Sequence, residues 1–92
     1  MGLRWTEGAA RDLETIATYL FENTPLHAPR LVHSIYGAVT TLTNFPNRGR
    51  KGKMAGTREL VLPSLPYVVV YEVTGDAIYV VRILHGAQEW PD

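Results

Sequence analysis

The chain has 92 residues, of which 46% are hydrophobic, and its nine basic side chains are balanced by nine acidic ones. This length leaves room for one domain with one modest core, so residues 1–92 are expected to fold as a single unit. Because cysteine is absent, a disulfide scaffold, a thiol nucleophile and a thiolate metal site are excluded. No apolar run approaches the roughly 20 residues that cross a bilayer, and no signal-peptide core follows the N-terminus, so we expect a cytoplasmic protein without membrane contact.

The N-terminal segment predicts a short strand followed by a helix. Leu3 and Trp5 alternate with polar neighbours, as in a strand, and Thr6 is suited to cap the helix that follows. Apolar residues then recur at helical spacing and form one stripe: Ala9, Leu13, Ile16, Ala17 and Leu20. The helix is expected to end near Asn23, because Pro25 disfavours helical geometry at the residue before it.

A second helix is predicted before Pro46. Its apolar residues step by four and three alternately, which keeps them on one side of the helix: Leu31, Ile35, Ala38, Leu42 and Phe45. Proline lacks the backbone N–H that a helix needs, so Pro46 stops this one directly after Phe45. Together, the two helices are expected to form an antiparallel hairpin.

Three strands are predicted in the rest of the chain, at residues 56–62, 67–73 and 78–86. The middle strand has apolar residues on both faces, so we expect it to be central, and Thr74-Gly75-Asp76 predicts a hairpin turn after it. The whole order predicts an α+β fold of two layers, with the helical hairpin on one face of a mainly antiparallel sheet. The other face is left to bind a peptide helix or to be closed by the C-terminal tail.

Basic side chains concentrate in one short segment, in which only Glu59 opposes them. They are Arg48, Arg50, Lys51, Lys53 and Arg58. This segment is either a solvated loop or a positive surface for phosphates or an acidic protein partner. A buried guanidinium is costly, so Arg58 and Arg82, which lie in apolar strands, must reach an edge, a carboxylate or a ligand. A purely structural alternative pairs Arg58 with Glu59 or Glu72 across strands and makes Arg82 an anchor for the tail.

Common catalytic motifs are absent from the sequence. There is no Gly-x-Ser-x-Gly nucleophile elbow, and the glycines of the basic segment do not have the spacing of a phosphate-binding loop. His27, His33 and His85 lack paired ligand spacing, so no metal and no organic cofactor are expected. His85 ends a strand, where it suits either a general acid or base or a structural hydrogen bond. Trp90 suits packing or, if exposed, a protein interface.

Short motifs in a fixed order extend along nearly the whole chain. They are Trp5-Thr6, Ala9, Asp12-Leu13, Ile16 and Tyr19-Leu20, then Phe45-Pro46, Gly49-Arg50 and Gly56-Thr57-Arg58-Glu59-Leu60, then Tyr67 and Tyr71, and finally Arg82-Ile83-Leu84-His85-Gly86. Their order and spacing resemble the toxins of the RelE/ParE superfamily of bacterial type II toxin–antitoxin systems. The resemblance implies the same two-layer fold and the toxin of a plasmid-stabilisation module. It also implies a hetero-oligomer with a cognate antitoxin, whose C-terminal segment wraps around the toxin.

Two mechanisms exist within that superfamily. RelE-like members are ribosome-dependent mRNA interferases, whereas ParE-like members poison DNA gyrase. RelE-like nucleases carry Arg directly after the tyrosine of the middle strand and again shortly after the last strand, where this chain has Tyr67-Val68 and Ala87-Gln88. These departures remove cations that would hold the scissile phosphate, and zero net charge fits poorly with docking among ribosomal RNA phosphates.

The resemblance therefore favours a ParE-like toxin that binds gyrase. The target-binding residues are then expected to be Arg48, Arg50, Lys51, Lys53, Arg58, Arg82 and Trp90. One alternative is a RelE-like mRNA interferase, an endoribonuclease in which Arg58 and Arg82 bind phosphate and His85 moves the proton, provided that the three lie on one edge of the sheet. A third hypothesis is a binding module of the same fold without toxicity.

Overall fold

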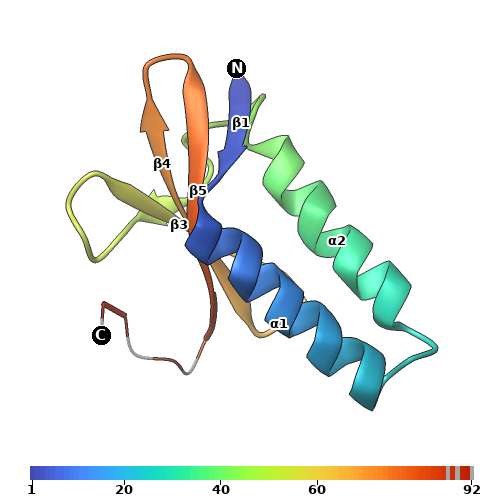
Figure 1. Cartoon of the computed structure of the whole chain (residues 1–92). Coiled ribbons are helices and arrows are strands. Elements are labelled where there is room, and N and C mark those ends of the chain that lie inside the picture. Colours follow the sequence, from blue (N-terminus) through green and yellow to red (C-terminus); the bar gives the residue numbers. More distant parts are fainter. Residues whose placement is uncertain (87, 89, 92) are drawn as a thin grey trace.

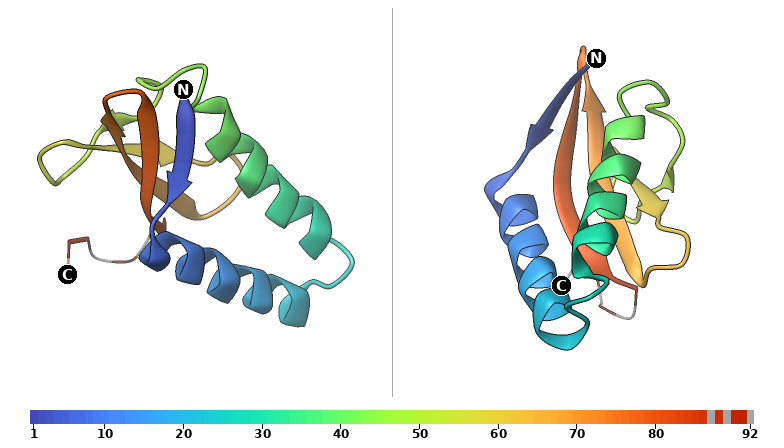
Figure 2. Two further views of the ribbon diagram at one scale, coloured as in Figure 1. Left: turned by 45° about the horizontal axis from the view of Figure 1, so that its top comes forward. Right: turned by 90° about the vertical axis from the view of Figure 1, so that its right-hand side faces the viewer.

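The computed structural model describes residues 1–86, 88, 90 and 91. Its elements follow in the order β1 (Gly2–Trp5), α1 (Glu7–Asn23), α2 (Ala28–Thr41), β2 (Arg50–Lys51), β3 (Thr57–Val61), β4 (Tyr67–Thr74) and β5 (Ala77–His85). The two helices run in opposite directions and diverge in a V from their connecting turn, while the strands form a twisted sheet beside them (Figures 1 and 2). This arrangement confirms the predicted α+β fold.

The strands form one five-stranded sheet in the order β1-β5-β4-β3-β2, so the strand predicted to be central is central. The β1 strand pairs parallel with β5, and the other neighbours pair antiparallel. In the turn between β4 and β5, Gly75 has a φ of +60°, which is the conformation expected for it. The short strand β2 lies within the segment that the sequence predicted as a loop.

The hydrophobic core lies between the helices and one face of the sheet. The helices contribute Ala9, Leu13, Ile16, Leu20, Ala28, Ile35, Val39 and Leu42 to it, and the sheet side contributes Leu60, Leu62, Tyr67, Val69, Tyr71, Ile78, Val80 and Ile83. Alternation along the strands explains this set, because residues two apart point to the same face. In the predicted stripe of α1, only Ala17 is not fully buried.

The second helix is shorter than the sequence predicted, because it ends at Thr41 instead of Phe45. The chain tightens beyond it, with the N–H of Leu42 donating to Val39 O at 3.0 Å, an i→i+3 bond. Phe45 is 64% exposed, so its place on the buried stripe was wrong. The physical reason is Pro46, which disfavours helical geometry at Phe45 and lets the chain leave the helix before it.

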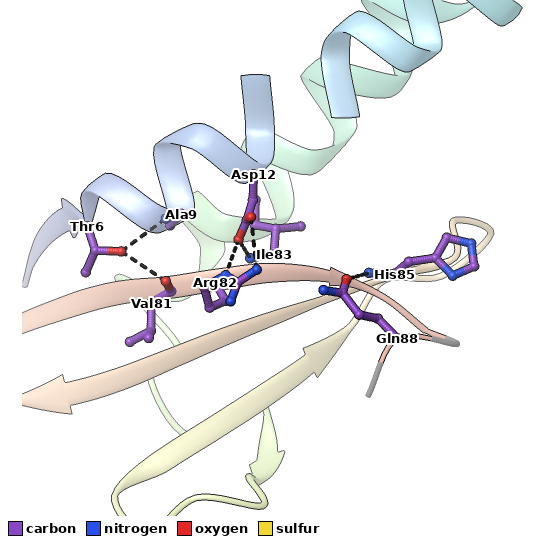
Figure 3. A network of polar contacts seen from close by, with 8 residues as sticks. All are labelled: Thr6, Ala9, Asp12, Val81, Arg82, Ile83, His85 and Gln88. Carbon is purple, nitrogen blue, oxygen red and sulfur yellow. Dashed lines mark hydrogen bonds and ion pairs between the residues drawn. The ribbon is translucent and has the colours of Figure 1, made fainter. Parts of the chain in front are cut away.

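Thr6, the residue directly before the first helix, covers part of the β5 edge beyond the end of β1. Pairing between β1 and β5 stops at Trp5, opposite Val80. Beyond it the backbone N–H of Thr6 donates to Val80 O at 3.0 Å, and the Thr6 hydroxyl donates to Val81 O at 3.0 Å. The same hydroxyl caps α1 by accepting from the Ala9 N–H at 3.1 Å (Figure 3). Thr6 thus ends β1, continues the edge contact and begins α1.

The second face of the sheet is partly covered by the C-terminal tail. Val70 and Leu84 are buried, although they are not part of the core beneath the helices. Trp90 and Gln88 line a small cavity together with Leu84 on this face. For the described residues, the tail therefore covers part of this face, in agreement with the expectation that the C-terminal tail closes it. Among those residues, neither helix is long and apolar enough to cross a membrane.

Candidate functional site

Glu59 holds the basic segment against the sheet. This carboxylate is only 5% exposed, and its Oε1 accepts from Arg50 Nη2 at 3.1 Å, while its Oε2 accepts from the Lys53 backbone N–H at 3.0 Å. The hydrogen bond from the Lys53 amide, helped by the pairing with Arg50, lowers the pKa of Glu59 although burial opposes this. The ion pair with Glu59 therefore neutralises much of the charge of Arg50, although the Arg50 side chain is 62% exposed.

Arg58 is bonded to backbone carbonyls of the same chain. Its Nη1 donates to Gly49 O at 2.7 Å and more weakly to Asn47 O at 3.4 Å. The structural alternative that pairs it with Glu59 or Glu72 is therefore wrong, because the guanidinium turns toward the loop before β2. Backbone carbonyls thus meet the requirement that a half-buried guanidinium finds acceptors.

Tyr71 holds the same loop from below, a role that sequence reasoning missed. Its hydroxyl donates to Pro46 O at 2.7 Å and accepts from the Gly49 N–H at 2.8 Å. The side chain is fully buried in the central strand. The sequence could have indicated this role, because Tyr71 lies on the apolar face of a central strand and a buried phenol needs a hydrogen-bond partner.

The positive surface is smaller than the sequence indicated. Arg48 donates from Nη1 to Thr41 Oγ1 at 3.0 Å and stays exposed. The ammonium groups of Lys51 and Lys53 make no hydrogen bond or ion pair within the described part of the chain. Three of the five cations, Arg48, Lys51 and Lys53, therefore remain available to a partner.

Arg82 joins the first helix to the last strand. Its Nε donates to Asp12 Oδ2 at 2.7 Å and its Nη2 donates to Asp12 Oδ1 at 3.3 Å (Figure 3). Asp12 Oδ2 also accepts from the Ile83 backbone N–H at 2.9 Å, so it pairs with a backbone donor of β5 beyond the end of β1. The Arg82 guanidinium carbon lies 5.7 Å from the centre of the Trp90 ring, a cation–π distance. The expectation that Arg82 anchors the tail is confirmed.

His85 lies at the end of β5 with its ring against an aromatic neighbour. The rings of His85 and Tyr67 meet edge to face at 6.0 Å, and the His85 N–H donates to Gln88 Oε1 at 3.3 Å (Figure 3). Burial, and secondarily the neighbouring Tyr19, raise the pKa of Tyr67, so its phenol stays protonated near neutral pH. His85 and both tyrosines line one groove of about 420 Å³ beside α1.

The three residues that a nuclease would use are not gathered at one point. Arg58 pairs in register with Tyr71 of β4, whereas His85 pairs with Tyr67, four residues away along the same strand. Four residues of a strand span roughly 13 Å. Arg82 is nearer to His85 in the chain, but its guanidinium is bonded to Asp12.

A small cavity on the second face brings other predicted residues together. Arg50, Lys53 and Trp90 line it with Val68 and Gln88, the positions near which RelE-like nucleases carry arginine. Its volume is about 60 Å³, far less than a nucleotide needs. The neighbouring Ala87 lies outside the described residues. Within the described residues, no group of three His, Asp or Glu side chains is arranged to hold a metal ion.

Comparisons with known proteins find several similar toxins. Toxin Y4kP of Sinorhizobium fredii is 38% identical over 89 residues, which cover 97% of this chain and 92% of the relative. Toxin RelE2 of Caulobacter vibrioides is 38% identical over 84 residues, covering 91% of this chain and 93% of that toxin. The solved structure of a chromosomal ParDE toxin–antitoxin system from P. aeruginosa contains a chain with 32% identity and a TM-score of 0.86, and the match covers 92% of this chain and 95% of that one.

The family model that matches this chain is described as the ParE toxin of the type II toxin–antitoxin system parDE. The match extends over residues 3–90, which include both helices, strands β2 to β5, most of β1 and the position of Trp90. The chain therefore belongs to the ParE toxin family of type II toxin–antitoxin systems.

Proposed function

We propose that this toxin inhibits growth by poisoning DNA gyrase in the cytoplasm, and that it does so by binding and not by cutting RNA. The observation that carries the proposal is the engagement of both strand arginines: Arg82 is held by Asp12, and Arg58 is held by loop carbonyls. Arg58 lies four strand residues from the register position of His85, and the Nε and Nη2 donors of Arg82 are already bonded to a carboxylate, whereas stabilising a phosphorane needs unengaged donors. The proposed contacts with gyrase are the exposed Arg48, Lys51 and Lys53, with Trp90 and the last strand.

An RNA-cutting function remains the second candidate. Its support is the similarity to the Caulobacter toxins named RelE2 and RelE1, at 38% and 35% identity. The exposed imidazole of His85 beside the protonated phenol of Tyr67 would then move the proton, and the substrate would be mRNA on the ribosome. A non-toxic binding module of the same fold is the third candidate.

The family assignment implies an antitoxin as partner, and we propose a hetero-oligomer in which its C-terminal segment wraps around the toxin. An apolar groove of about 450 Å³ runs between the two helices and supports this proposal. It is lined by Trp5, Ala10, Leu13, Glu14, Ala17, Val32 and Tyr36. Such a groove suits the apolar face of an amphipathic helix.

Pulse labelling of DNA and protein synthesis, directly after the toxin is induced without antitoxin, tests the proposal. Gyrase poisoning predicts that DNA synthesis stops first, whereas an mRNA interferase stops protein synthesis first. The variant His85→Ala separates the two mechanisms further, because a nuclease loses its proton-transfer group while a gyrase binder keeps most of its toxicity. Undisturbed growth with wild-type protein would favour the non-toxic module.

A further inference from the structure

We propose that residues 44–48, here called the Phe45 loop, form a preorganised docking surface for an acidic segment of the target protein. The inference rests on the proposed function in one respect, namely that the toxin acts by binding a protein target. It adds Phe45 and the residues around it to the contact already proposed for Arg48, outside the tail and the last strand.

The Phe45 loop presents an aromatic ring and a cation side by side. Phe45 is 64% exposed, and Asn44, Pro46, Asn47 and Arg48 surround an open hollow of about 610 Å³ with it. A single exposed apolar residue is ordinary on a protein surface and indicates nothing by itself. Aromatic residues and arginine are, however, the residues that dominate the energy of protein interfaces.

The Phe45 loop differs from an ordinary surface loop because several hydrogen bonds, two of them made by the buried Tyr71 hydroxyl, fix it together with the adjoining Gly49. Tyr71 bonds both Pro46 and Gly49, Arg58 bonds the carbonyl of Gly49, and Arg48 reaches back to Thr41. The Arg48 N–H also donates to Phe45 O at 3.1 Å, which closes a turn. Folding has therefore already ordered the loop, so a partner that binds it pays less conformational entropy on binding.

The charge around the Phe45 loop selects an acidic partner. From Asn23 through Arg58 the chain carries six Lys and Arg residues and no Asp or Glu. The next acidic residue, Glu59, is buried and paired with Arg50. A segment with a carboxylate for Arg48 and an apolar side chain for Phe45 would match both features.

A nucleic acid fits this surface less well than a protein does. Binding a phosphate backbone needs a track of several cations, but Arg50 is paired with Glu59, Arg58 is bonded to loop carbonyls, and the net charge of the chain is zero. The exposed ring of Phe45, which lines one hollow with Arg48, instead resembles a protein hot spot with its polar rim.

The test compares loop variants with matched controls in the full-length toxin. Phe45→Ala removes the ring and Arg48→Glu reverses the charge, while Phe21→Ala and Arg30→Glu make the same changes at exposed positions outside the loop. We expect each loop variant to lose about tenfold or more in inhibition of growth and of purified gyrase, and each control to stay within about twofold. The unfolding midpoint of Phe45→Ala and its affinity for the antitoxin should stay unchanged, because Phe45 is 64% exposed. Arg48→Glu loses its exposed hydrogen bond to Thr41, so its unfolding midpoint should fall only slightly.

Several results would overturn the inference. Loop variants as toxic as wild type would exclude docking there, and weakened antitoxin binding with intact toxicity would assign the surface to the antitoxin. Binding of a single-stranded RNA oligonucleotide that depends on Phe45 would replace the protein partner with RNA. A wild-type toxin that leaves both growth and gyrase unaffected would leave the loop without a target. If growth inhibition requires Phe45 while gyrase is unaffected by wild type, the gyrase proposal fails and the docking loop stands with another protein target.

Discussion

Gly49 has no space for a side chain, because the loop passes directly over Tyr71. A Cβ atom there would lie 2.8 Å from both Cε1 and the hydroxyl oxygen of Tyr71 and 3.0 Å from the backbone carbon of Glu59. Gly49→Ala is therefore expected to lower the free energy of unfolding by about 1–3 kcal/mol, as overpacking does. Chemical denaturation of the purified protein measures it.

Gly37 provides the control for this substitution. It lies in α2, and a Cβ there meets nothing within 4 Å. Gly37→Ala should stabilise the protein by about 0.5–1 kcal/mol, because alanine is the better helix former. If Gly49→Ala were as stable as wild type, the loop would be able to move away from Tyr71 at little cost, and the close approach at residue 49 would not constrain it.

Glu59 should make stability depend on acid pH. Its pKa is lowered in the folded protein from the ordinary value of 4.5, so the folded state binds the proton less readily than the unfolded state does. The stabilisation is therefore complete above the unfolded pKa and is lost as pH falls through the lower folded pKa. Glu59→Gln should weaken this loss of unfolding free energy below about pH 4.5, as urea denaturation across a pH series would measure.

The exposed Glu22→Gln variant is the control for this pH series and should follow the wild-type curve. If Glu59→Gln also keeps the wild-type acid dependence, the hydrogen bond from Lys53 and the ion pair with Arg50 do not hold the carboxylate as described.

At the scale of elements, Asp12 is the residue that ties α1 to the edge of β5. It accepts from Arg82 and from the Ile83 N–H, and its side chain is only 18% exposed. Asp12→Ala removes the acceptor that both donors share and should cost about 2–3 kcal/mol of unfolding free energy. Asp12→Asn keeps an acceptor for Ile83 but loses the ion pair, so it should fall between alanine and wild type.

Glu14→Ala, an exposed change on the same helix, is the matched control and should stay within about 0.5 kcal/mol of wild type. If Asp12→Ala were as stable as that control, the edge of β5 would not depend on the helix. Denaturant titration reports all three variants under the same conditions.

Local signals explain which elements were predictable from the sequence. The start of α1 followed from Thr6, whose hydroxyl caps the helix, and its end followed from Pro25. The end of α2 was misplaced because Phe45 fits the apolar spacing, although Pro46 already disfavours a helix at that residue. The two residues of β2 show no strand pattern in the sequence. Their position depends instead on pairing with β3 and on the hydrogen bond that the Glu59 carboxylate accepts from Lys53.

The site was only partly predictable, for a related reason. The cost of burying a guanidinium indicated that Arg58 and Arg82 need acceptors, and both have them. Which acceptors they use depends on contacts between distant parts of the chain: Asp12 is 70 residues from Arg82, and Pro46 is 25 residues from Tyr71. Periodicity and spacing contain no information about such pairs.

At the scale of the whole molecule, the sheet separates two ends with different chemistry. His85 and Tyr67 lie with the tail at one end, whereas the Phe45 loop lies over Tyr71 and Arg58 further along the same strands. The two regions are about four strand residues apart, roughly 13 Å, so one protein partner can contact both of them.

DNA supercoiling by purified gyrase in the presence of purified toxin distinguishes gyrase poisoning from cleavage of mRNA. We predict that the wild-type toxin and His85→Ala both inhibit supercoiling, that Phe45→Ala inhibits it at least about tenfold less, and that an equimolar cognate antitoxin restores it. Unaffected supercoiling at a large molar excess of toxin, together with mRNA cleavage on ribosomes that disappears in His85→Ala, would contradict the account and establish the nuclease mechanism instead.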